Sequence, residues 1–113
     1  MFAEVKGTLP ISGDDYDEEI IMQIKAAALD LTRTSEFVMP GEISITRAQD
    51  RQGVWTVTDN STVEDELVIM TIATWCNMRI GNPPNYDKLL AAYEAMKGQL
   101  RLSKYYNGTV TTE

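Results

Sequence analysis

The densest group of side chains that could do chemistry is acidic, because residues 14–19 contain five carboxylates in six positions. Several carboxylates on one loop can bind a hard cation such as Ca²⁺. A calcium loop of the EF-hand type needs glycine at its sixth position, and counting from Asp15 or Asp17 that position holds Ile20 or Met22. We therefore interpret the run as the solvated first turn of a helix, where acids favour the positive end of the helix dipole.

The amino-acid composition excludes the common histidine-dependent and cysteine-dependent catalytic sites. The 113 residues include no histidine and one cysteine, which excludes a Ser-His-Asp triad, a Cys-His pair and imidazole metal ligands. The seven glycines are scattered, without the spacing of a phosphate-binding loop. Cys76 lies in an apolar run, where a small buried side chain is typical. We expect no enzyme, no metal and no cofactor, and a role in binding or assembly.

Charge is unevenly distributed along the chain. Ten Lys and Arg against 17 Asp and Glu give a net charge of -7, divided as -5 over 1–41, -4 over 42–66 and +2 over 67–113. This overall sign disfavours general DNA binding through phosphate neutralisation. Nothing resembles a signal peptide or a membrane span of about 20 apolar residues, so we expect a protein outside the membrane and outside the general export route.

The elements that must position these residues are mostly helical. We predict a single domain over 1–113 of the mainly α class, a small bundle of three long helices with a β-hairpin insertion and an extended C-terminal tail. The expected segments are a lead-in over 1–13 with a short helical turn near residues 5–9, helices over 14–35, 61–80 and 85–102, a hairpin over 42–58 and a tail over 103–113.

Three of these predictions carry the most detail. Ser61 with Glu64 forms a capping-box pattern and places the start of the second long helix at 61. That helix is apolar on nearly every face, so we expect it to be buried on several sides. A two-stranded hairpin is marginal in water, so the hairpin should lie against a helix or a neighbouring chain, with Trp55 as its anchor.

The assembled pattern resembles the head-tail connector proteins of tailed bacteriophages, also called adaptor or head completion proteins, of the HK97-type and SPP1-type arrangement. The matching pieces, in order, are Val5-Lys6-Gly7-Thr8-Leu9, the helical segments 20–28 and 67–79, a proline-containing turn, and 89–93 leading to Leu100-Arg101. The similarity covers most of the chain outside residues 42–60. The hairpin departs from the shorter connection of many members.

The resemblance implies a structural virion protein, assembled in the host cytoplasm into a ring, commonly of twelve copies. Such a ring binds the portal, continues the DNA channel towards the tail and meets a stopper or tail-completion protein. Passing double-stranded DNA is a partner without sequence-specific binding. In the family the C-terminal segment reaches the portal, which here makes the candidate portal contacts Tyr105, Tyr106, Thr109, Val110 and Thr111.

The hairpin supplies the other candidate residues. Candidate contacts with a neighbouring subunit or partner are Ile43, Ile45, Trp55 and Val57, and candidate channel-facing acids are Glu42 and Asp50. An acidic channel wall would let DNA slide without holding its phosphates. The alternative function is a small acidic interaction module or DNA mimic that inhibits a DNA-binding host protein. A mimic should spread carboxylates over one face, whereas these acids concentrate at helix starts.

Overall fold

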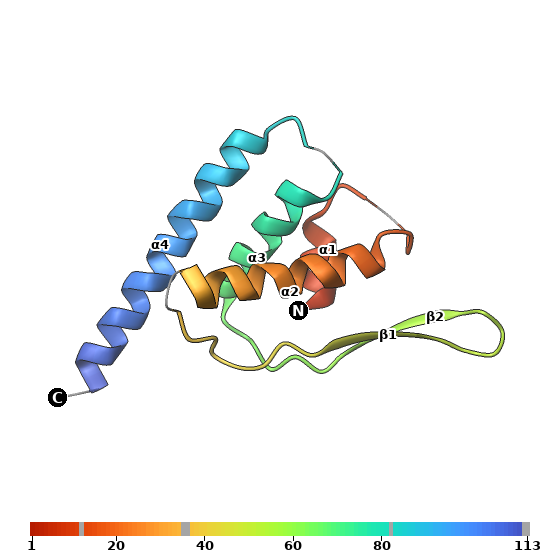
Figure 1. Cartoon of the computed structure of the whole chain (residues 1–113), viewed down its shortest axis with the longest axis horizontal. Coiled ribbons are helices and arrows are strands. Elements are labelled where there is room, and N and C mark those ends of the chain that lie inside the picture. Colours follow the sequence, from red (N-terminus) through yellow and green to blue (C-terminus); the bar gives the residue numbers. More distant parts are fainter. Residues whose placement is uncertain (12, 35–36, 82, 112–113) are drawn as a thin grey trace.

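Four helices and one hairpin make up the described part of the chain (Figure 1). The computed structural model describes residues 1–11, 13–34, 37–81 and 83–111, with the backbone alone at 34 and 103–111. In chain order the elements are α1 (Phe2–Thr8), α2 (Asp17–Thr34), β1 (Ile45–Gln49), β2 (Trp55–Asp59), α3 (Glu66–Arg79) and α4 (Tyr86–Thr111). The mainly α class and the hairpin are thus confirmed.

The helix α3 lies at the centre of the molecule. Helices α1, α2 and α4 all pack against α3. Their contacts with one another and with the hairpin are much less extensive. Its buried side chains include Val68, Ile72, Ala73 and Cys76, and Met70 is the large apolar residue that it exposes. The sequence of α3 is apolar on almost every face, and this burial by three neighbours confirms the expectation drawn from it.

The start of α3 differs from the prediction. The helix begins at Glu66, not at residue 61, and the Ser61 capping box does not form. Asp65 is the cap, because its Oδ1 accepts hydrogen bonds from the N–H groups of Leu67 at 2.9 Å and Val68 at 3.2 Å. The residues before Asp65 stay extended because they pair with the segment leading into β1. In this pairing the Ser44 N–H donates a hydrogen bond to Ser61 Oγ at 3.0 Å.

The two ends of the chain are more helical than predicted. Residues 2–8 form the complete helix α1 in place of an irregular lead-in, and Val5 on it is fully buried. The prediction of an extended tail over 103–113 is wrong for the described backbone, since α4 continues to Thr111. Each added helical residue gains a hydrogen bond, whereas a strand would need a partner, so Gly108 and the β-prone residues after it do not end the helix.

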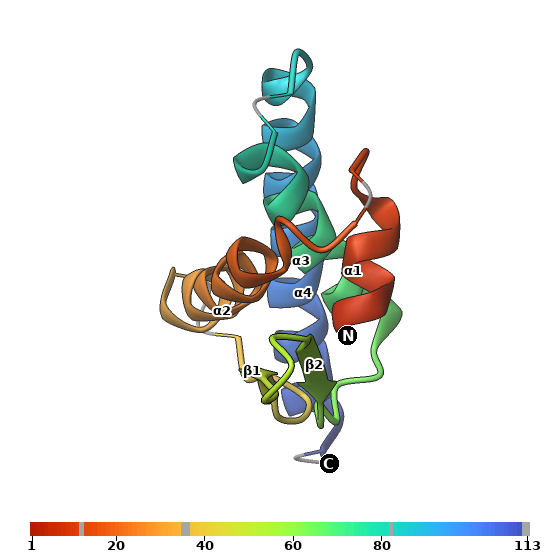
Figure 2. The same ribbon diagram turned by 90° about the vertical axis from the view of Figure 1, so that its right-hand side faces the viewer.

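The hairpin is antiparallel, with register from Ile45 opposite Asp59 to Gln49 opposite Trp55. Its turn is held by Asp50, whose Oδ1 accepts from the N–H groups of Gln52 and Val54 at 2.9 Å each. Gly53 takes a φ of 84°, which favours glycine. Seen end-on, α1 and α2 lie over one face of the hairpin (Figure 2).

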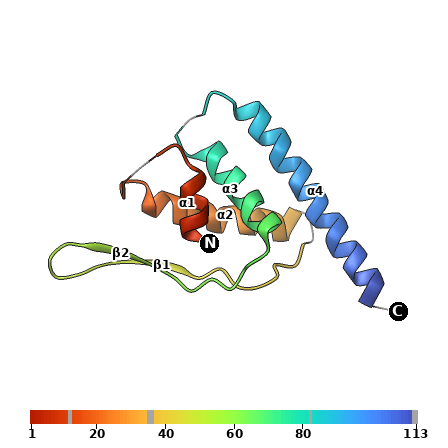
Figure 3. The ribbon, with the colours of Figure 1, turned by 180° about the vertical axis from the view of Figure 1, so that it is seen from behind.

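The anchor of the hairpin is Ile45 and not Trp55. Ile45 is 1% exposed within the helical core, whereas Trp55 is 47% exposed. The reason is position: the hairpin runs past the helices, so its far end has no helix to pack on (Figures 1 and 3). The predicted packing against helices therefore holds for the base of the hairpin only.

The central position of α3 gives a stability prediction. Ile72→Ala should lower the free energy of unfolding by about 2 to 5 kcal/mol, because it leaves a cavity where three helices meet. Met70→Ala on the same helix should change it by less than about 0.5 kcal/mol, since Met70 is 60% exposed. Urea denaturation of both variants measures the difference, and equal losses would contradict a core centred on α3.

Candidate protein-interaction site

The acidic run at the start of α2 is mostly exposed, as predicted, with Asp17 as its one buried carboxylate. Asp17 is buried, and Lys6 Nζ on α1 lies 2.7 Å from its Oδ1 and 3.4 Å from Asp14 Oδ1. The hydrogen bond to Asp17 is the main cause that raises the pKa of Lys6. No cluster of three or more Cys, Asp or Glu side chains among the described residues could hold a metal ion. Asp17, with Asp14, therefore joins the start of α2 to α1.

The single thiol is enclosed in the core. Cys76 is buried on α3, and desolvation raises its pKa to about 12. A thiol that stays protonated at neutral pH is a poor nucleophile. Cys76 therefore serves as a small apolar side chain.

Asp59 joins the base of the hairpin to α1. Its Oδ2 accepts the Phe2 N–H at 2.7 Å and lies 3.1 Å from the Met1 amine, and its Oδ1 accepts the Ser61 N–H at 3.0 Å. Partial burial alone would raise the pKa of Asp59, but the hydrogen bonds from Ser61 and Phe2 outweigh it, and the pKa lies well below its usual range. A charged group thus fixes where the hairpin leaves the helices.

A second polar contact sets α4 against α2. The hydroxyl of Tyr93, which is 1% exposed, donates to Asp30 Oδ2 at 2.5 Å, and Lys97 Nζ lies 3.0 Å from the same oxygen. Burial, and then the hydrogen bond to Asp30, raise the pKa of Tyr93 above the ordinary tyrosine range. These three side chains form the Asp30 contact, which holds two helices that are far apart in sequence.

Trp75 extends this contact to α3. Its ring lies 5.3 Å from the Tyr93 ring at 56°, and its indole N–H donates to Gln23 Oε1 on α2 at 2.9 Å. The guanidinium of Arg79 lies 4.3 Å from the centre of the same ring. Sequence reasoning missed the bond between Trp75 and Gln23, because two residues 52 positions apart leave no local pattern.

The far end of the hairpin presents apolar side chains to solvent. We call residues 50–55 the hairpin tip, in which Val54 is 56% and Trp55 47% exposed. The guanidinium of Arg47 covers one side of Trp55, with Cζ 4.0 Å from the ring centre, and also lies 3.4 Å from Glu18 of α2. The indole is therefore held in a fixed orientation with part of its surface free.

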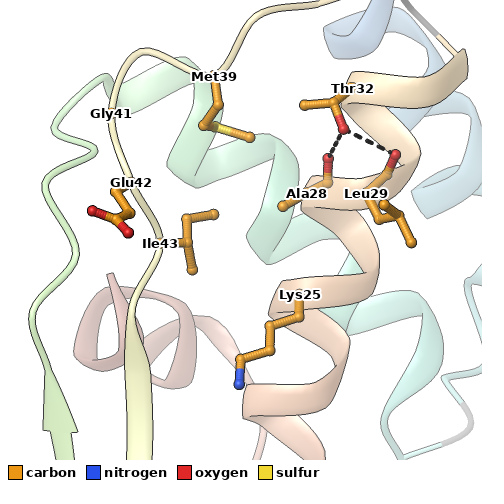
Figure 4. A pocket seen from close by; sticks show the side chains of 8 residues that line it. All are labelled: Lys25, Ala28, Leu29, Thr32, Met39, Gly41, Glu42 and Ile43. Atoms are coloured by element: carbon orange, nitrogen blue, oxygen red, sulfur yellow. Dashed lines mark hydrogen bonds between the residues drawn. The ribbon is translucent and has the colours of Figure 1, made fainter.

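A groove lies between α2 and the segment leading into the hairpin (Figure 4). We call it the α2 groove; its volume is about 400 Å³, and it is lined by Lys25, Ala28, Leu29, Thr32, Met39, Gly41, Glu42 and Ile43. Met39 and Ile43 point towards α2, and Leu29 is 49% exposed. The lining is mainly apolar and open to solvent, which is typical of a binding surface.

The structure separates the residues that the sequence grouped as hairpin contacts. Ile43 lines the α2 groove and Trp55 belongs to the hairpin tip, while Ile45 is buried in the core and Val57 is partly buried. Of these four residues only Trp55 is exposed; Ile43, like Val57, is partly buried against the core and presents its free part to the α2 groove. The α2 groove was missed, because Leu29 lies off the main apolar stripe of its helix and looks like a single exposed leucine.

The remaining predicted site residues have mixed outcomes. Glu42 is exposed and its carboxylate points away from α2 in Figure 4, whereas Asp50 holds the hairpin turn with its carboxylate. The side chains of the five candidate portal contacts lie outside the described residues; these are Tyr105, Tyr106, Thr109, Val110 and Thr111.

Comparison with known proteins identifies no relative. No protein-family model, no curated protein and no solved structure matches the chain. In addition, no helix in the described ranges is long and apolar enough to cross a membrane.

The Asp59 contact predicts a specific dependence of stability on acid. Because the pKa of Asp59 is lower in the folded chain than its ordinary 3.8, its stabilising effect is complete above that pH and is lost as the pH falls below it. Asp59→Asn should cost about 1 to 3 kcal/mol at pH 7. The difference in the free energy of unfolding between Asp59→Asn and the natural chain should become smaller as the pH is lowered to about 2, measured by urea denaturation. A constant difference would contradict the assignment.

The Asp30 contact predicts the opposite trend at alkaline pH. Because the pKa of Tyr93 is raised on folding, the natural chain should lose stability as the pH rises above about 10, where unfolded tyrosine ionises. Tyr93→Phe should cost about 1 to 3 kcal/mol at pH 7 and should lack this part of the alkaline loss. Tyr86→Phe, at the exposed start of α4, is the control. Equal effects of the two variants in urea denaturation would contradict the assignment.

Proposed function

We propose that this protein is a structural subunit of a phage head-tail connector, which assembles as a ring beneath the portal and continues the DNA channel to the tail. One observation carries the proposal. The chain has two unlike exposed apolar surfaces, the hairpin tip and the α2 groove, which lie towards opposite ends of the hairpin. A contact between two unlike surfaces repeats from copy to copy and closes into a ring when the rotation allows it.

The use of the chemistry-bearing side chains agrees with a mechanical role. Lys6 pairs with Asp17, the Tyr93 hydroxyl is bonded to Asp30, and Cys76 is enclosed. Each of these groups stabilises packing between helices and none lines the α2 groove. These groups therefore serve the fold, as expected of a subunit whose work is mechanical.

The long final helix supports an end that reaches another protein. α4 has 26 residues, and its last turns run away from the hairpin at the other end of the molecule (Figure 3). We place the portal contact on these turns and propose that it is made by a helix, because the helical backbone up to Thr111 replaces the extended tail expected from the sequence. A stopper or tail-completion protein would then meet another face of the ring.

The acidic mimic is the weaker alternative. A DNA mimic needs free carboxylates spread over one face, yet many acids of this chain are engaged within it. Asp17 and Asp30 form ion pairs, Asp59 binds the start of α1, and Asp50 and Asp65 hold a turn and a helix start. The exposed acids that remain, such as Glu42, would suit a channel wall that does not hold passing DNA.

The experiment is assembly with a portal protein encoded in the same genome. Size-exclusion chromatography with light scattering, followed by negative-stain microscopy, should show a ring of this chain bound to the portal. A chain ending at Leu102 should keep its fold and lose that binding. A full-length chain that never binds the portal, or that binds a host DNA-binding protein as a monomer, would contradict the proposal.

A further inference from the structure

We propose that the hairpin tip of one copy inserts into the α2 groove of a neighbouring copy. This inference rests on the proposed ring and names the contact by which two copies meet. The tip is the most protruding apolar feature of the hairpin, and the groove is an open apolar hollow on the same chain. The occupant to which the proposal commits is therefore a second copy of this chain.

The two surfaces match in chemistry, since both are mainly apolar. The tip offers an indole and a neighbouring valine, both about half exposed, and Arg47 fixes the indole by stacking on one side. A rigid aromatic side chain loses little conformational freedom on binding and is the type most often found at the centre of interfaces. The groove is open along its length and mainly apolar, so an indole can lie against Leu29, Met39 and Ile43.

The geometry prevents a chain from filling its own groove. The groove lies beside the C-terminal half of α2 and the base of the hairpin, whereas the tip lies beyond the N-terminal end of α2 (Figures 1 and 4). The base of the hairpin is held to the core by Ile45 and by the bond between Asp59 and Phe2. The tip therefore points away from its own groove and is presented to another molecule.

The charges of the two surfaces are also compatible. Lys25 is the base that lines the groove, and the exposed tip carries Asp50 together with Arg51. Because Glu42 also lines the groove, each surface carries one charge of each sign, and pairing Lys25 with Asp50 and Glu42 with Arg51 favours one orientation of the inserted tip. Glu42, proposed above as a candidate for the channel wall, lies beside this contact, so insertion of the tip would draw it towards the interface between copies.

Two variants each remove one half of the contact. Trp55→Ser alters the tip and leaves the groove intact, and Leu29→Asp alters the groove and leaves the tip intact. Each should weaken self-association by roughly thirtyfold, the loss expected for an aromatic anchor or its pocket. The matched controls are Tyr86→Ser, an exposed aromatic residue on α4, and Met22→Asp, an exposed residue on the same helix as Leu29. Both controls should associate like the natural chain.

Mixing the two variants tests the insertion directly by analytical ultracentrifugation. Each variant alone should be monomeric, and an equal mixture should form a dimer of one chain of each kind, because one intact tip and one intact groove remain. Growth should stop there. A Trp55→Ser chain that assembles like the natural chain, or a mixture that stays monomeric, would overturn the proposal. Because the two variants change different elements, misfolding of one leaves the other as a test against its control.

The outcome also separates this inference from the proposed function. If the natural chain shows no self-association at about 1 mM, the tip-in-groove contact is overturned, whereas connector function is judged by portal binding. If rings form on the portal and Trp55→Ser and Leu29→Asp leave them intact, the ring stands and this contact is wrong.

Discussion

The whole arrangement depends on the need to bury α3. A helix that is apolar on almost every face cannot remain in water, and in this chain α1, α2 and α4 cover it. No single neighbour could do this, so three segments that are distant in the sequence are brought around one axis. Polar contacts then fix how the surrounding helices are placed. Asp30 binds Tyr93 and Lys97 of α4, and Asp59 binds the start of α1.

These contacts also decide what is left exposed. With α2 pressed on α3, Leu29 faces outwards, and the segment leading into the hairpin runs beside it to form the α2 groove. With Ile45 drawn into the core, the hairpin must leave the helices at a fixed point, and its tip carries Trp55 into solvent. The two apolar surfaces are therefore consequences of the same packing, and their separation along one rigid chain is what a repeated contact between copies requires.

Much of the fold could be predicted from the sequence, since the apolar periodicity of 14–35 and 85–102 and the alternation around Gly53 are local signals. The errors have physical causes. The local pattern of Ser61 and Glu64 predicts a helix cap at Ser61, but pairing with the segment near Ser44 keeps Ser61 extended and leaves Asp65 as the cap. A large aromatic residue such as Trp55 is expected to anchor a hairpin, and only the length of the hairpin shows that its far end has no helix beneath it. The α2 groove and the Asp30 contact depend on long-range packing that no local pattern contains.

The central claim is that copies of this chain meet by placing a hairpin tip in an α2 groove. The most direct measurement is disulfide trapping between two chains, one carrying Val54→Cys beside the intact Trp55 and the other carrying Leu29→Cys. A disulfide forms only where the two Cα atoms come within about 7 Å, and the buried Cys76 is shielded from the reaction. The account predicts rapid formation of the mixed disulfide in assembled protein and little with Met22→Cys in place of Leu29→Cys. Equal trapping at positions 22 and 29, or none at either in assembled rings, would contradict it.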